Sequence, residues 1–140
     1  MLNALGGGRA LGALKRMLAA IIRRRESMRD RYLEVSRSES EVRGIKLLKD
    51  WLSAEQLSQF RKYGHFEVVG CATGRRYRIR YGLVTNVHEL DEQGRAIAGW
   101  CFVPNQPLVQ GDVMLAQKIA LETDELRALA VAKPFRPTWC

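Results

Sequence analysis

The apolar residues of this chain change their spacing at about residue 65. From Leu11 to Val42 they recur at alternating steps of three and four, which is the spacing of one face of a helix. From His65 to Val103 they alternate with polar residues, which is typical of half-buried strands. A helical segment followed by consecutive strands and a further helix predicts an α+β fold.

Capping and turn residues divide the second part of the chain. Ser53 and Gln56 form a capping box that begins a helix, and Gly64 is the left-handed residue that ends it after Tyr63. The strands are then predicted at residues 65–70, 75–81, 83–90 and 95–103, with a hairpin turn at 91–94. Such short connections predict a four-stranded antiparallel meander.

A helical segment is predicted after the strands. Asp112 is expected to cap a helix that runs from Val113 to about Leu121 and continues over residues 124–132. This segment would pack on one face of the sheet, while the tail 133–140, with two prolines, is not expected to be regular helix. We expect residues 50–140 to form a small α+β globular domain.

The first 49 residues are predicted to be a basic amphipathic helical arm. Its apolar stripe gives a moderate coiled-coil signal and is a candidate oligomerisation surface, formed by Leu11, Leu14, Leu18, Ile21, Met28, Tyr32 and Val35. One helix over 11–42 would be about 48 Å long and would overhang the globule. Alternatively, a break at 36–40, where Ser38 and Glu41 make a capping box, would let two helices fold back as a hairpin.

Positive charge is concentrated in this arm. Residues 1–49 hold 12 Lys and Arg against 5 Asp and Glu, whereas residues 50–140 hold 11 against 10, and the net charge is +8. A basic arm on a nearly neutral domain favours a polyanionic partner, nucleic acid before an anionic membrane surface. The arginines of the arm that we predict to contact phosphates are Arg23, Arg24, Arg25, Arg29 and Arg31.

A second basic cluster lies on the predicted strand 75–81. Alternation places Arg76, Arg78 and Arg80 on one face, about 6.6 Å apart, and the intervening apolar residues on the other. Guanidiniums in such a row can bind a run of phosphates. The alternative is a solvated face whose arginines pair with Glu67 and Glu89 of neighbouring strands.

Catalytic and metal-binding patterns are weak. His65, Cys71, His88 and Cys101 lack the short ligand spacings of zinc modules, and no nucleophile lies in a recognisable catalytic context. We therefore expect no enzyme activity, metal or cofactor. Three cysteines and no secretory signal favour reduced thiols and a cytoplasmic location. If the chain is instead a subunit of a phage particle, the alternative considered below, it would be virion-associated.

Several short motifs of residues 50–132 occur together in a known group of proteins. They are Leu52-Ser53-x-Glu55-Gln56, Gly64-x-Phe66-x-Val68-x-Gly70, Thr73-Gly74-x-x-Tyr77-Arg78-Ile79, Asn86-Val87, Trp100-Cys101-Phe102 and Gly111-Asp112-Val113-Met114. With this set the chain resembles short uncharacterised proteins of bacterial chromosomes and phages. The resemblance leaves out the arm and implies no function or catalytic residue.

The sequence thus favours a non-enzymatic accessory protein that binds nucleic acid. In this hypothesis the arm contacts phosphates and mediates oligomerisation, and the arginine row is a second contact surface. The alternative is a structural or assembly subunit of a phage particle or multiprotein complex, which docks through its N-terminal helix.

Overall fold

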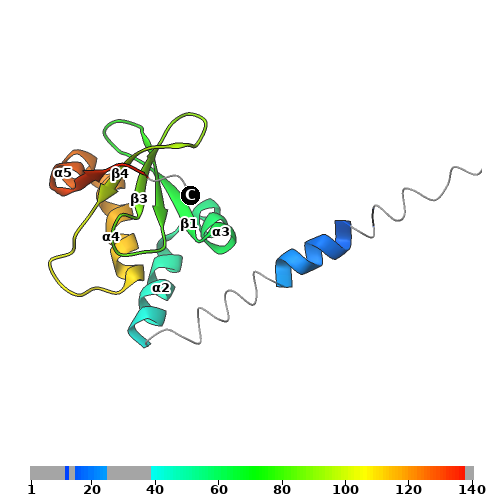
Figure 1. The fold of residues 1–140 in the computed structure, drawn as a ribbon. Coiled ribbons are helices and arrows are strands. Elements are labelled where there is room, and N and C mark those ends of the chain that lie inside the picture. Colours follow the sequence, from blue (N-terminus) through cyan, green and yellow to red (C-terminus); the bar gives the residue numbers. More distant parts are fainter. Residues whose placement is uncertain (1–11, 13–14, 25–38, 138–140) are drawn as a thin grey trace, which may run out of the picture. The chain divides into compact units, whose positions relative to one another are not determined.

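The structure is a computed structural model that describes residues 12, 15–24 and 39–137 (Figure 1). The chain forms two compact units, Met1–Arg37 and Ser38–Cys140. The second unit therefore begins earlier than residue 50, the boundary that the sequence predicted. Helix α2 (Glu39–Trp51) accounts for the difference, because its Ile45 and Leu48 are buried in the core of the globular unit.

In the first unit the structure describes part of the basic helix. Residues 12 and 15–24 are helical, and Leu18 and Ile21 of the predicted stripe are exposed, as are Met17 and Ile22. The other stripe residues, and the question whether 11–42 is one helix, lie outside the described residues; these stripe residues are Leu11, Leu14, Met28, Tyr32 and Val35.

The second unit contains an antiparallel sheet of five strands in chain order. They are β1 (His65–Val69), β2 (Arg76–Arg80), β3 (Val87–Leu90), β4 (Ala96–Cys101) and β5 (Lys133–Phe135). The helices are α2, α3 (Ala54–Tyr63), α4 (Gln110–Thr123) and α5 (Glu125–Val131). This arrangement confirms the α+β class and the meander of the first four strands.

The sheet differs from the prediction at two places. β5 was not predicted; it returns after the helices and pairs with β4, with Phe135 opposite Gly99. β3 is shorter than predicted. The side-chain amide of Asn86 donates through Nδ2 to the carbonyls of Arg80 and Gly82, and so holds residues 82–85 in a loop. In that loop Thr85 has a positive φ of 52°.

The core lies between α4 and one face of the sheet. α4 contacts β1 and β2, and α2 packs against α4. The largest fully buried side chains include Tyr77, Phe66 and Ile79 from the sheet and Met114 and Leu121 from α4. The face of the sheet that points away from α4 is the surface from which the β2 arginines project.

Local signals set the ends of α3, whereas tertiary contacts set the start of α4. The capping box of Ser53 and Gln56 is present, and Gly64 ends α3 with a φ of 71°. The prediction that Asp112 caps α4 is wrong: the helix begins at Gln110, whose N–H donates to Glu41 of α2 at 3.1 Å. A carboxylate from another helix therefore replaces the local cap.

The α2–α4 crossing depends on two glycines. A Cβ built on Gly111 would lie 2.2 Å from the carbonyl carbon of Gly44. Both glycines are buried, so the two helix backbones come into direct contact at this point. Larger residues at either position would force the helices apart.

Candidate nucleic-acid interface

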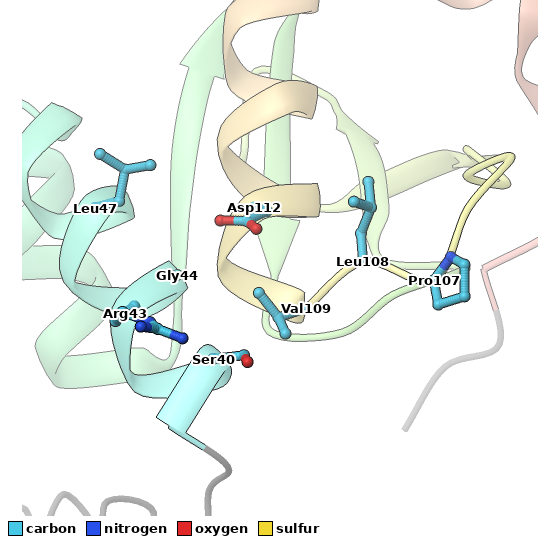
Figure 2. A pocket seen from close by; sticks show the side chains of 8 residues that line it. All are labelled: Ser40, Arg43, Gly44, Leu47, Pro107, Leu108, Val109 and Asp112. Carbon is cyan, nitrogen blue, oxygen red and sulfur yellow. The ribbon is translucent and has the colours of Figure 1, made fainter.

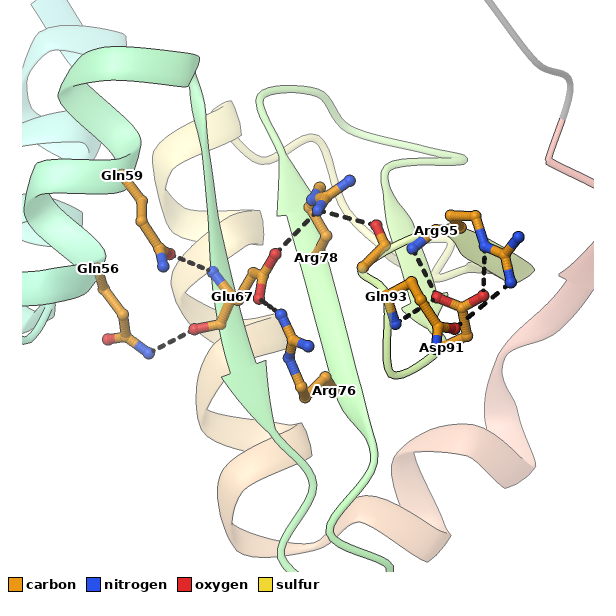
Figure 3. A network of polar contacts seen from close by, with 9 residues as sticks. Gln56, Gln59, Glu67, Arg76, Arg78, Asp91, Gln93 and Arg95 are labelled. Atoms are coloured by element: carbon orange, nitrogen blue, oxygen red, sulfur yellow. Dashed lines mark hydrogen bonds and ion pairs between the residues drawn. The ribbon is translucent and has the colours of Figure 1, made fainter.

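The arginine row of β2 lies on the face of the sheet opposite α4, as the alternation predicted. Tyr77 and Ile79 are fully buried, whereas Arg76 and Arg78 are half-buried and Arg80 is exposed. Figure 3 shows Arg76 and Arg78 beside Glu67 on this open face, with a helix behind the strands. We call this surface the outer face.

Glu67 of β1 bridges two arginines of the row. Arg76 donates to its Oε2 at 2.6 Å and Arg78 to its Oε1 at 2.9 Å (Figure 3). Burial raises the pKa of Glu67, but the hydrogen bonds and charges of the two guanidiniums outweigh it and hold the pKa below its ordinary value. At neutral pH Glu67 is therefore a carboxylate that lies among the guanidiniums of the row.

The pairing that the sequence offered as the alternative is thus present in part. Glu67 pairs with two members of the row, but Glu89 pairs with Arg75, which precedes the row, at 3.2 Å. Arg80 forms no ion pair with another described residue. Pairing therefore reduces the positive charge of the outer face without removing it.

The backbone of Glu67 is held from the other side by α3. Gln56 donates through Nε2 to the carbonyl of Glu67 at 2.9 Å, and the N–H of Glu67 donates to Gln59 Oε1 at 2.8 Å (Figure 3). These two side chains fix the position of the central residue of β1. The Glu67 carboxylate is consequently presented to the arginines from a rigid backbone.

An aromatic pair extends the outer face beside Arg80. The rings of Tyr63 and His65 are stacked with centroids 5.4 Å apart, and Tyr63 is 52% exposed. His65 lies opposite Arg80 in the β1–β2 register. Burial, together with the positive charges of Arg78 and Arg80, lowers the pKa of His65 to about 4, so that it is uncharged at neutral pH.

A second aromatic contact lies toward β5. His88 faces Arg78 across the β2–β3 pair, and its ring meets Phe135 edge to face at 5.6 Å. Burial and the charges of Arg80 and Arg78 lower the pKa of His88 as well. Phe135 lies over Gly99, where a Cβ would be 2.3 Å from its ring. Apolar and aromatic surface therefore accompanies the guanidiniums, as in surfaces that bind bases and phosphates together.

The basic helix of the first unit is strongly amphipathic over the part that is described. At 100° per residue, Met17, Leu18, Ile21 and Ile22 share one face, while Arg16 and Arg23 lie opposite them. Arg23 and Arg24 are exposed. The other predicted phosphate contacts of the arm lie outside the described residues; they are Arg25, Arg29 and Arg31.

An open groove lies between α2 and the segment that enters α4 (Figure 2). Its volume is about 440 Å³, and its apolar side chains are those of Leu47, Pro107, Leu108 and Val109. Its polar side chains are Ser40, Arg43 and Asp112. The groove contains no residue of the outer face and is separate from the candidate interface.

Sequence reasoning missed a buried carboxylate. Glu125 is fully buried, and it accepts hydrogen bonds from the N–H groups of Ala72 and Thr73, both at 2.8 Å, from the Thr73 hydroxyl, and from the Tyr77 hydroxyl at 2.7 Å. Its role is structural, because it joins α5 to the β1–β2 turn and to β2. No local pattern around Glu125 indicates this burial.

Among residues 12, 15–24 and 39–137, no three His, Cys, Asp or Glu side chains are grouped as metal ligands would be. Cys71 is exposed and Cys101 half-buried, each as a free thiol. No helix in the described part of the chain is long and apolar enough to cross a membrane.

Comparison with known proteins identifies no family for the chain. It matches no protein-family model, no curated protein and no solved structure. The resemblance to short bacterial and phage proteins therefore stays a prediction, and the case for function depends on the outer face and the basic helix.

Proposed function

We propose that this protein is a non-enzymatic accessory protein that binds nucleic acid through the outer face of its sheet and through its basic helix. The row of Arg76, Arg78 and Arg80 on the open side of β2 is the observation that carries this proposal. Arginine guanidiniums are the side chains best suited to phosphate oxygens, because their planar donors can bind two oxygens at once.

Two properties of the outer face support nucleic acid as its ligand. His65 beside the row is uncharged at neutral pH, and the pKa of His88 lies below its ordinary value, so that the positive charge of the row comes from arginine and not from these histidines. The exposed Tyr63 ring lies on His65, which is opposite Arg80 in the register, and Lys62 Nζ lies over the same ring at 4.8 Å, so that an aromatic group and a further positive charge adjoin the row.

The basic helix adds a second source of phosphate contacts. Residues 15–24 hold Lys15, Arg16, Arg23 and Arg24 and contain no Asp or Glu. Such a segment increases affinity for any polyanion without sequence preference, whereas the outer face is the surface on which bases can be contacted.

The test is fluorescence anisotropy of labelled single-stranded and double-stranded oligonucleotides in a salt series with the full chain. Changing the three row arginines to alanine is expected to weaken binding and to reduce the salt slope by about 0.7 on a single strand for each phosphate that is no longer neutralised. Arg127→Ala, an exposed arginine of α5, is the control. A triple variant with the slope of this control would exclude the row from the interface.

A second candidate is a structural or assembly subunit that docks through its N-terminal helix. The exposed apolar face of residues 17–22 favours it, since Met17 is 65% and Ile22 54% exposed. Mass measurement by light scattering separates the two functions. A fixed ring or filament formed without nucleic acid, together with no binding at low salt, supports assembly.

A further inference from the structure

Glu67 occupies a position between two guanidiniums. One carboxylate oxygen accepts from Arg76 at 2.6 Å and the other from Arg78 at 2.9 Å. Two guanidiniums that converge on one oxyanion form the arrangement by which proteins also hold a phosphate group. The internal carboxylate and an external phosphate therefore compete for the same donors.

The donors are not fully used by the carboxylate. Arg78 also donates to the carbonyl of Gly94 at 3.2 Å, but its Nε is buried and has no hydrogen-bond partner among the described residues. A phosphate group offers more oxygen acceptors than a carboxylate. Exchange of Glu67 for a phosphate can thus satisfy a donor that the ion pair leaves unpaired.

The geometry allows this exchange without movement of the sheet. The side chain of Arg76 is 43% exposed, so a phosphate can approach the pair from solvent. Gln56 and Gln59 hold the backbone of Glu67, and rotation of its side chain alone releases the guanidiniums. Arg76 is 43% exposed, whereas Arg78 and Glu67 are 20% and 19% exposed, so the bond to Arg76 is the one that costs less to break.

We propose that Glu67 is a built-in competitor for the phosphate groups of nucleic acid, which lowers the affinity of the outer face and reduces the number of phosphates it neutralises. This inference rests on the proposed function. It adds that the outer face binds nucleic acid more weakly than its three arginines would allow, and that the Glu67 carboxylate accounts for this difference in affinity.

The test compares Glu67→Gln with Glu55→Gln in the full chain, using a labelled 20-nucleotide single strand in a salt series. Both variants raise the net charge by one, but Glu55 lies in the first turn of α3 and not on the outer face. Release of a partly exposed ion pair worth up to about 1 kcal/mol predicts about fivefold tighter binding for Glu67→Gln. Its slope should steepen by about 0.7 for each additional phosphate that is neutralised.

Val69→Glu provides the opposite change if Glu67→Gln does not fold. Val69 is 58% exposed and lies opposite Arg76 in the register, so a carboxylate there adds a second competitor. We expect weaker binding and a shallower slope than in Ser58→Glu, an exposed position of α3 that changes the charge equally.

The outcomes distinguish the inference from the function on which it rests. If the unchanged protein binds and each outer-face variant behaves like its charge-matched control, Glu67 is not a competitor and the inference is overturned. If neither the unchanged protein nor Glu67→Gln binds at low salt, the proposed function is overturned with it. Tighter binding and a steeper slope for Glu67→Gln alone support both.

Discussion

The buried carboxylate of Glu125 allows a stability prediction that separates charge from packing. Four donors converge on it: two backbone N–H groups on Oε2 and two hydroxyls on Oε1. In Glu125→Gln the amide oxygen can still accept from the two N–H groups, while the amide nitrogen meets the hydroxyls of Thr73 and Tyr77. Both hydroxyls can rotate and accept, so the variant keeps the shape and loses the charge.

The magnitude follows from these hydrogen bonds. A hydrogen bond to a charged group contributes about 1.5–3 kcal/mol, and we expect Glu125→Gln to lower the free energy of unfolding by about 2 kcal/mol. Because Ala72 and Thr73 are exposed residues, we expect water to replace the lost carboxylate at their N–H groups, so Glu125→Ala does not lose the full sum of four bonds. It leaves the buried Tyr77 hydroxyl unpaired and a void behind it, and should cost about 4 kcal/mol.

Urea denaturation followed by circular dichroism measures both values, with Glu92→Gln, at an exposed position of the 91–94 turn, as the control. We expect the control to change the free energy of unfolding by less than about 0.5 kcal/mol. Should Glu125→Gln unfold at the same urea concentration as Glu92→Gln, the carboxylate would contribute nothing as a charged acceptor, and the reasoning would fail.

The dependence on pH provides a second check. Burial raises the pKa of Glu125, but the hydrogen bonds from Thr73, Tyr77 and Ala72 outweigh it, so the folded pKa lies below the ordinary value of 4.5. Because the folded pKa is depressed, the contribution of the Glu125 carboxylate to the free energy of unfolding is complete above about pH 4.5. It is lost as the pH falls through the folded pKa. The gap between the original protein and Glu125→Gln should therefore be constant from pH 8 to 5 and shrink below; a gap unchanged at pH 3 would contradict this.

Two further predictions concern the α2–α4 crossing and the outer face. Gly111→Ala should lower the free energy of unfolding by more than about 2 kcal/mol in urea denaturation, because the new Cβ meets the backbone of Gly44. Gly64→Ala is the control: it is strained only by its positive φ and should cost about 1 kcal/mol. Equal costs for the two variants would refute the close approach of the α2 and α4 backbones. His65 should titrate near pH 4 by NMR, and Arg80→Ala should raise its pKa only partly, because burial is the larger cause; a value near 6.5 in the original protein would contradict the burial.

Elements whose signals are local could be predicted from the sequence. Ser53, Gln56 and Gly64 specify both ends of α3 through contacts within the helix itself, and the alternation of β2 gives the faces of its arginines. Such features depend on residues a few positions apart, and the sequence displays those directly.

Features that depend on distant contacts could not be predicted. β5 has the sequence Lys133-Pro134-Phe135, and a proline in a short segment argues against a strand until β4 is available as its partner. Glu125 reads as an ordinary acidic residue at the start of a helix, and its burial results from the β1–β2 turn more than 50 residues earlier. The pairing of Glu67 with two arginines, rather than one, likewise depended on the register of β1 and β2.

Both edges of the sheet are closed to further strands. At the outer edge of β1, Gln56 and Gln59 bond to the carbonyl and N–H of Glu67, groups that another strand would need. At the opposite edge, β5 has only three residues, and Pro134 at its centre has no N–H to donate. The fold therefore resists the edge-to-edge aggregation to which open sheets are prone, and we expect the described domain to associate through side-chain surfaces and not by extension of its sheet.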